Sequence, residues 1–281
     1  MHYLLAISGG IDSVVLLDSL ARKGGHKLTV AHFDHGIRPD SAADARFVQA
    51  LAETYGLPCV TAREELRPGA SEELARNRRY AFLRSEAEKH DATIVTAHHG
   101  DDVVETIVIN LIRGTGWRGL AVLDTPDVVR PLLGMSKDDI RTYARVKGLE
   151  WVEDSTNASG HYLRNRVRQA IGTTMNTKSR QEVLELWKRQ LRVKVSIDEL
   201  LAGHIRTDSE YSRHFFIQVD PIVAQELLRA VIVAAGGASP TRPQTQRALL
   251  MVKTARPRTV FEVSAGVTLR FQIATFVVQT P

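Results

Sequence analysis

The sequence predicts an α/β protein in which a wound parallel sheet is followed by a helical connector and a small α+β C-terminal domain. Short apolar runs alternate with helical patterns up to about residue 170, as they do when crossover helices join parallel strands. The alternation then stops, and residues 179–203 form a long stretch with helical periodicity. Residues 259–278 alternate apolar and polar side chains, which is typical of short antiparallel strands.

The elements of the first part each have a local signal. Short apolar runs predict four strands, at residues 3–7, 28–33, 58–62 and 93–97. Helical periodicity predicts a first helix over VVLLDSLARKG and three more, at residues 41–56, 71–90 and 101–113. Ser41 and Ser71 are N-cap residue types at the starts of two of these helices. Because wound parallel sheets bind ligands outside the carboxyl ends of their strands, we expect the functional site at that edge.

Composition indicates an ordinary globular protein, with 43% hydrophobic and 25% charged residues. No apolar run approaches the ~20 residues that a membrane helix needs, and the apolar N-terminus is too short for a signal peptide. We therefore expect a cytoplasmic protein without a membrane partner. Cys59 is the only cysteine, so the sequence excludes an intrachain disulfide and a paired-cysteine zinc site.

Charge is unevenly distributed along the chain. Residues 1–150 hold 19 Lys and Arg against 21 Asp and Glu, whereas residues 151–281 hold 18 against 11, a net charge of +7. The second half therefore carries the positive field that a polyanion would feel. A basic, solvated surface without a partner explains the charge equally well.

A glycine-rich turn, Ser8-Gly9-Gly10-Ile11-Asp12-Ser13, lies between the first predicted strand and its helix. At such a turn, glycines let the backbone approach a phosphate, N–H groups point inward and the helix dipole favours negative charge. Ser8 and Ser13 add hydroxyl donors, and Asp12 is a carboxylate that could hold magnesium beside the phosphates. The turn differs from the GxxxxGK[ST] phosphate loop. A tight turn without a ligand is the alternative, but its place directly after the first strand favours a nucleotide site.

Polar side chains follow the fourth predicted strand. Asp102 and Glu105 are spaced i, i+3 and share one helix face, where two carboxylates could hold a cationic amine and accept its proton. His98 or His99 could contact a nucleotide, and local hydrogen bonding at the end of the strand is an equal alternative. A metal site of two histidines and carboxylates is less favoured, because adjacent histidines in an extended segment point to opposite faces.

Seven further motifs follow the glycine-rich turn in order. They are AHFDHGIR at 31–38, ELARNRRY at 73–80, TAHHGDDVVET at 96–106, LIRGTG with RGL at 111–120, RPLL at 130–133, EDSTN at 153–157 and RNRVR at 164–168. This ordered series resembles the tRNA(Ile)-lysidine synthase family, whose fold is that of the PP-loop (N-type) ATP pyrophosphatases. The resemblance covers about the first 170 residues.

The resemblance implies a reaction in two steps. ATP adenylates the C2 oxygen of the wobble cytidine in tRNA(Ile) with a CAU anticodon, and pyrophosphate leaves. The ε-amine of L-lysine then attacks C2 and displaces AMP, which gives lysidine. The expected enzyme is therefore a ligase that forms a carbon–nitrogen bond, with ATP and Mg²⁺ as cofactors. We expect residues 1–170 to be the catalytic domain, 171–205 a connector and 206–281 a small domain that contacts tRNA. The sequence leaves open whether the protein forms a homodimer.

Site residues are predicted as four groups. The nucleotide is expected to contact Ser8, Gly9, Gly10, Ile11, Asp12, Ser13, His32, Thr96 and His98, with the metal on Asp12. Lysine is expected at Asp34, Asp102 and Glu105. The catalytic residues are expected to be Asp12, Asp102, Glu105 and Arg113, the last of which lies in a Gly-rich loop. Phosphates of the tRNA are expected at Arg76, Arg79, Arg164, Arg166 and Arg168.

For the arginines, salt bridges to Glu72, Glu73, Glu153 or Asp154 are the alternative to RNA contacts. Two departures from the family pattern are Val103, where Gln is common, and Thr156, where Ser is common. Many members also have a longer C-terminal region, so how this chain would discriminate its tRNA is left open. The rival functions are a tRNA 2-thiocytidine-type thiolase of the same fold, which the single cysteine disfavours, and a non-enzymatic module that binds ATP and RNA.

Overall fold

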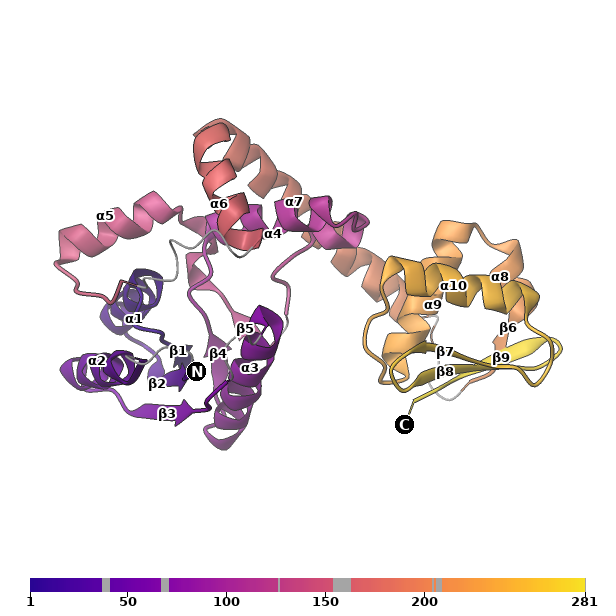
Figure 1. The fold of residues 1–281 in the computed structure, drawn as a ribbon, viewed down its shortest axis with the longest axis horizontal. Coiled ribbons are helices and arrows are strands. Elements are labelled where there is room, and N and C mark those ends of the chain that lie inside the picture. The colour runs from indigo at the N-terminus through magenta and orange to yellow at the C-terminus, as the bar shows by residue number, and fades with distance from the viewer. Residues whose placement is uncertain are drawn as a thin grey trace. The chain divides into compact units, whose positions relative to one another are not determined.

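The computed structural model describes residues 1–36, 41–66, 71–125, 127–153, 163–203, 205 and 209–280, and the chain forms two compact units (Figure 1). The first unit comprises Met1–Arg113 and Val122–Trp187, and the second comprises Gly114–Ala121 and Lys188–Pro281. The long helix α7 (Thr177–Ala202) contributes to both units. The domain boundaries near residues 170 and 205 stay predictions.

The first unit is built on a parallel sheet, as predicted, and the sheet has five strands, one more than the four expected. Its strands are β1 (His2–Ala6), β2 (Lys27–Asp34), β3 (Cys59–Arg63), β4 (Thr93–Val95) and β5 (Val128–Val129), in the order β3-β2-β1-β4-β5. The register pairs Leu5 of β1 with Val30 of β2 on one side and with Val95 of β4 on the other. β1 is therefore the central strand, and all of these strands end at the same edge of the sheet.

Helices cover both faces of this sheet (Figure 1). Successive strand residues point to opposite faces, and apolar side chains on each face pack against helices. Leu5 and Val95 pack with α1 (Ile11–Lys23), α2 (Ser41–Thr54) and α5 (Lys137–Lys147). Their neighbours Leu4 and Ile94 pack on the other face, against Tyr80 and Leu83 of α3 (Glu72–Lys89). Ser71 caps α3 as expected, since its side chain accepts a hydrogen bond from the Leu74 N–H.

Three helices form a separate cluster beyond the sheet. α4 (Gly100–Ile112) follows β4, and its residues Val104 and Ile109 pack against Val167 and Ile171 of α6 (Leu163–Thr174) and against the start of α7. The 3₁₀ turn η2 (Pro131–Gly134) approaches the start of α4, where the Gly100 N–H donates to the Met135 carbonyl at 2.8 Å. A Cβ at Gly100 would lie 3.1 Å from that carbonyl oxygen. The first turn of α4 is thus held at the sheet edge.

A buried carboxylate joins three of the helices in the first unit. Asp18 of α1 has no exposed surface and accepts hydrogen bonds from Arg22, Tyr55 and Tyr143. Burial alone would raise the pKa of Asp18, but these three hydrogen bonds hold it below its ordinary value. Burial and the hydrogen bond to Asp18 also raise the pKa of Tyr55 to about 12. This cluster fixes α5 against α1, which matters for the site described below.

The second unit is a small α+β structure, as predicted. Its antiparallel sheet has the order β6-β9-β8-β7. The strands are β6 (Tyr211–Ser212), β7 (Val260–Ser264), β8 (Val267–Phe271) and β9 (Thr275–Gln279), and the helices are α8 (Arg213–Gln218), α9 (Pro221–Ala234) and α10 (Arg242–Thr254). Leu228, Leu249, Leu269 and Phe276 lie in its core.

One loop from the middle of the sequence also belongs to the second unit. Arg118, in the 3₁₀ turn η1 (Trp117–Leu120), donates to Asp198 of α7 at 2.8 Å and to Glu226 of α9 at 2.7 Å. The RGL motif is therefore an internal part of this unit.

No helix within the described ranges is long and apolar enough to cross a membrane. Arg38, Asp154 and Thr156 of the quoted motifs lie outside the described residues, as does the side chain of Glu72.

Candidate functional site

The candidate site lies where the strand order of the parallel sheet reverses. The chain runs from β1 outward through β2 and β3, and then returns to place β4 on the other side of β1. The segments after β1 and after β4 therefore leave the same edge in different directions, which creates the crevice in which wound sheets bind ligands. Residues 8–13 follow β1, and residues 96–99 follow β4. The structure thus brings together the two motifs that the sequence singled out.

The glycine-rich turn is held in place by its own hydroxyl groups. Gly9 adopts φ +91°, a conformation that favours glycine, and its carbonyl accepts a hydrogen bond from the Val152 N–H. The Ser13 hydroxyl donates to the Gly10 carbonyl at 2.8 Å and accepts from the Ser8 N–H at 3.2 Å. Gly10 is the N-cap of α1; it has no side chain that could cap the helix, and its N–H donates to the Ser8 hydroxyl at 3.4 Å. This half-buried helix start is suited to an anion such as a phosphate.

Asp12, in the first turn of α1, faces two other elements. Its Oδ1 atom lies 2.5 Å from the Nζ atom of Lys137, at the start of α5. It also lies 3.8 Å from Nε2 of His99, the N-cap residue of α4. The side chains of Asp12 and Lys137 are 33% and 30% exposed, so a ligand has access to both. Sequence analysis did not single out Lys137, which is 125 residues from Asp12 and outside every quoted motif.

His99 is buried among carboxylates. Its Nε2 atom lies 3.5 Å from Asp102, and its Nδ1 atom lies 3.8 Å from Asp101. Asp102 accepts a hydrogen bond from the His99 N–H at 3.0 Å. Burial would raise the pKa of Asp102, but His99 and Arg164 among others hold it below its ordinary value, so the carboxylate is ionised at neutral pH. The assignment of His98 rather than His99 to the nucleotide stays a prediction, although His99 is the one beside Asp12.

Glu105 is buried and held by two arginines of α6. Arg168 binds it with both ends of its guanidinium, from Nε to Oε1 at 2.6 Å and from Nη2 to Oε2 at 3.0 Å. Arg164 Nε lies 3.8 Å from Oε2. The structure therefore pairs two residues to which sequence analysis gave different ligands, lysine for Glu105 and RNA for Arg168. The alternative expected for Arg168 is a salt bridge to Glu72, Glu73, Glu153 or Asp154. In the structure, Arg168 forms its salt bridge with Glu105.

His98 makes a different hydrogen bond from its neighbour His99. Its Nδ1 atom is 2.8 Å from the Thr96 hydroxyl. Burial lowers the pKa of His98 to about 4; nearby Asp102 opposes this, and Arg130, Arg79 and Arg76 add to it. Arg76 and Arg79 thus lie close enough to the site to affect charge in it.

We expect the free energy of unfolding to fall as the pH drops from about 6.5 towards about 4, because the unfolded chain then binds a proton at His98 that the folded protein excludes. One such proton gives a slope of at most about 1.4 kcal/mol per pH unit. Above this window His98 is neutral in both states and contributes no slope. Denaturant unfolding at a series of pH values, for the protein and for His98→Gln, measures this component. The same acid-side slope in both proteins would contradict it.

Other predicted residues surround the end of β2. Asp34 is buried and accepts hydrogen bonds from the Gly36 N–H and the Ser41 hydroxyl, with Arg63 at 3.6 Å. These contacts give Asp34 a role in shaping its own loop, and its role as a lysine ligand stays a prediction. The His32 Nδ1 atom is 2.9 Å from the Ile7 carbonyl, so this side chain ties β2 to the residue that precedes the glycine-rich turn.

The remaining predicted arginines differ in their surroundings. Arg76 and Arg79 stack against Tyr80 on α3, at 4.9 Å and 5.7 Å from the ring centroid. Arg166 lies between Arg164 and Arg168 in sequence, and it is exposed because it projects from another side of α6. Arg113 is the exposed C-cap of α4, at the far end of that helix from His99. At a rise of 1.5 Å per residue, this helix separates the two residues by roughly 20 Å.

Val103 is fully buried in α4, so an apolar residue suits this position.

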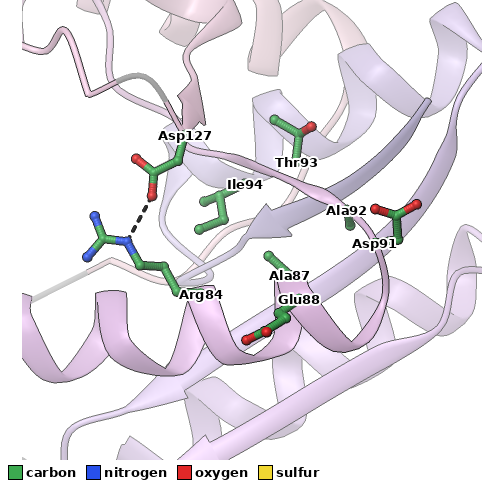
Figure 2. A pocket seen from close by; sticks show the side chains of 8 residues that line it. All are labelled: Arg84, Ala87, Glu88, Asp91, Ala92, Thr93, Ile94 and Asp127. Carbon is green, nitrogen blue, oxygen red and sulfur yellow. Dashed lines mark hydrogen bonds and ion pairs between the residues drawn. The ribbon is translucent and has the colours of Figure 1, made fainter.

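No group of three or more His, Cys, Asp or Glu side chains converges as a metal site in the ranges that the structure describes. A surface hollow of about 390 Å³ lies elsewhere, at the amino end of β4 (Figure 2). Its arginine, Arg84, is paired with Asp127 at 2.8 Å, and the hollow is at the opposite edge of the sheet from the glycine-rich turn.

Comparison with known families identifies the class of the chain. The PP-loop domain family matches residues 1–175, which include the whole parallel sheet and the site. The chain therefore belongs to the PP-loop domain family, and its first unit is the ATP-binding domain of that family. A U34-tRNA thiolase from Methanococcus maripaludis has a similar fold, with a TM-score of 0.58 and 17% identity over 68% of this chain and 72% of that one.

Curated relatives confirm the more specific resemblance. The tRNA(Ile)-lysidine synthase of Thermotoga sp. (strain RQ2) is 40% identical over 183 residues, and one from Thermus thermophilus is 42% identical over 173 residues. The matches cover 60% and 59% of this chain, but 44% and 34% of those proteins. The synthase of Nitratidesulfovibrio vulgaris is 36% identical over 66% of this chain and 59% of its own length. The chain thus spans less than two thirds of these relatives.

Proposed function

We propose that this protein joins L-lysine to C2 of the wobble cytidine in tRNA(Ile) with a CAU anticodon, using ATP and passing through an adenylated cytidine. The observation that carries the proposal is one juxtaposition. A helix start suited to phosphates after β1 faces a group of carboxylates after β4, in a domain that is 36–42% identical to tRNA(Ile)-lysidine synthases. A site that only bound ATP and RNA would gain nothing from carboxylates beside phosphates.

The two steps call for different groups. In the first, the C2 oxygen of cytidine attacks the α-phosphorus of ATP, the bond to the β-phosphate oxygen breaks, and pyrophosphate leaves. The N–H groups at the start of α1 and the hydroxyls of Ser8 and Ser13 would hold the phosphates. In the second, the lysine amine attacks C2, loses a proton, and the C2–O bond breaks as AMP leaves. Asp102 is the ionised carboxylate suited to hold the ammonium and take up its proton.

Magnesium fits this site as a companion of ATP. Its preferred ligands are oxygens, and it is commonly bound by one or two carboxylates together with substrate phosphates. Asp12 offers one partly exposed carboxylate beside the helix start. When bound, the ion would neutralise charge on the phosphates that leave as pyrophosphate.

Thiolation is the rival reaction on the same fold. The similar solved structure is a thiolase with a [4Fe-4S] cluster, and such clusters are held by several Cys thiolates. This chain has one cysteine, Cys59, and burial raises the pKa of its thiol on β3. A raised pKa makes a reactive thiolate less available, so sulfur transfer is disfavoured.

The test is an incubation of the protein with ATP, labelled lysine and either tRNA(Ile) with a CAU anticodon or a different tRNA. We expect release of AMP and pyrophosphate and one lysine bound per tRNA, with the CAU transcript only. AMP release without incorporation of lysine, or incorporation into any tRNA, would contradict the proposal.

We expect Arg166→Ala to weaken tRNA binding several-fold and to reduce the slope of log K against log salt by about 1, as loss of one phosphate contact does. Arg166 is exposed and is not drawn into the contacts of Glu105. Filter binding at several salt concentrations measures the slope, with the exposed Arg145→Ala on α5 as the control. An unchanged slope in Arg166→Ala would show that this side chain does not contact the tRNA.

A further inference from the structure

We propose that Lys137 is the residue that binds the β- and γ-phosphates of ATP, and therefore the pyrophosphate that the first step releases. This inference rests on the proposed function, because it assigns a new residue to the same ATP site. The starting observation is the contact of Lys137 Nζ with Asp12 Oδ1 at 2.5 Å. Asp12 is the second residue of α1, so the ammonium lies at the mouth of the phosphate-binding turn.

Hydrogen bonds of Ser136 and Lys137 fix the backbone at the start of α5. Ser136 caps α5, and Asp139 accepts hydrogen bonds from both the N–H and the hydroxyl of Ser136. The Lys137 N–H donates to Asp101 at 2.6 Å, and the other oxygen of Asp101 accepts from Arg180 of α7 at 2.9 Å. The first turn of α5 is thereby attached to the first turn of α4. Only the long side chain of Lys137 is left to move, and it is directed towards the turn.

Charge balance gives Lys137 its role. The triphosphate of ATP brings several negative charges next to Asp12, and the turn itself, Ser8–Ser13, contains no basic residue. In the structure, the ammonium of Lys137 neutralises Asp12. If Asp12 held magnesium together with ATP, the flexible stem of Lys137 would let its ammonium turn to the phosphates. The 30% exposure of this side chain leaves room for that change.

A purely structural role for Lys137 makes a different prediction. If the ion pair with Asp12 only joined α5 to α1, its loss would affect all ligands of the site together. Those helices are already joined by the hydrogen bond of Tyr143 on α5 to the buried Asp18 on α1. A phosphate role instead predicts a selective loss for ligands that contain the β- and γ-phosphates.

The experiment compares ATP, AMP and inorganic pyrophosphate by isothermal titration calorimetry, at fixed magnesium, with the full chain. We expect Lys137→Met to weaken binding of ATP and pyrophosphate at least tenfold and to leave AMP within twofold. Lys137→Arg, which keeps the charge, should stay within about threefold of the original protein. Lys147→Met, an exposed lysine in the last turn of the same helix, is the matched control. Thermal melting of each variant verifies its folding.

The outcomes separate this inference from the proposed function. If Lys137→Met bound ATP and pyrophosphate as tightly as the original protein does, the phosphate role of Lys137 alone would be overturned. A loss of affinity for AMP as large as the loss for ATP would overturn it too. A protein that binds ATP with the expected dependence on Lys137 but incorporates no lysine would overturn the proposed reaction and support the role of Lys137. A protein that binds neither ATP nor pyrophosphate would overturn both.

Discussion

Asp12→Asn should reduce the release of AMP and pyrophosphate about 10³-fold, as loss of one group that stabilises transition-state charge does. The carboxylate faces the helix start that is suited to phosphates, and it is the oxygen ligand that would meet a magnesium ion there. The amide of Asn keeps the size of the side chain but removes the charge that attracts both the metal and Lys137. We therefore expect the loss in turnover, with a small effect on the free energy of unfolding.

The measurement is the initial rate of pyrophosphate release with saturating tRNA and lysine, over a range of magnesium concentrations. Asp138→Asn is the matched control, because Asp138 is also in the first turn of a helix but is 82% exposed and paired only with Arg141 in its salt bridges within the described chain. A folded Asp12→Asn protein that turns over at the original rate would show that Asp12 has no part in the reaction.

The sequence predicted the sheet and its edge because those features are local. Alternation of apolar runs and helical patterns extends over many residues, so β1 to β4 and the turn after β1 could be found. β5 was missed because a strand of two residues has no periodicity. For α5 and α10 the signals were present: Ser136 and Asp139 form one capping box, and Thr241 and Gln244 form another. A search for these pairs would have found both helices.

Contacts between distant elements could not be predicted in this way. Glu105 and Arg168 are 63 residues apart, and Asp12 and Lys137 are 125 residues apart. Periodicity places each side chain on a face of its own helix, but the packing of α6 on α4 and of α5 on α1 decides which faces meet. Consequently the sequence assigned Glu105 and Arg168 to separate ligands, and it left Lys137 out of the site altogether. Long-range ion pairs of this kind therefore change the roles that we propose for individual residues.

Glu105 and Asp102 have different contacts, because Arg168 binds both oxygens of Glu105. Asp102→Asn and Glu105→Gln should therefore have different effects. We expect Asp102→Asn to keep at least a tenth of the formation of adenylated tRNA and to slow its reaction with lysine at least 100-fold, which is the scale of general base catalysis. In the proposed reaction, adenylation would need the phosphates, a metal and the cytidine oxygen. The attack of lysine would need a carboxylate that holds the ammonium and accepts a proton, and Asp102 is ionised and 16% exposed.

Glu105→Gln should instead act through stability. The Glu105 side chain is 4% exposed and bound at both oxygens by Arg168, which is itself 45% exposed. Replacing one partner of such a charged pair should lower the free energy of unfolding by about 2 kcal/mol, because hydrogen bonds between charged groups are lost while solvent still screens the arginine. Glu182→Gln, an exposed carboxylate on α7, is the control for this measurement.

A single-turnover experiment separates the two steps. Adenylated tRNA is trapped without lysine, and a lysine chase then gives the rate of transfer. If Asp102→Asn forms no adenylate, Asp102 serves the first step and the lysine assignment is wrong. If Glu105→Gln remains fully stable but loses the lysine step alone, Glu105 contacts lysine and exchanges Arg168 for it during the reaction. The expected pattern, a lost transfer step in one variant and lost stability in the other, follows because Arg168 binds both oxygens of Glu105 at hydrogen-bond distance but lies 3.9 Å from Asp102, whose other oxygen faces His99.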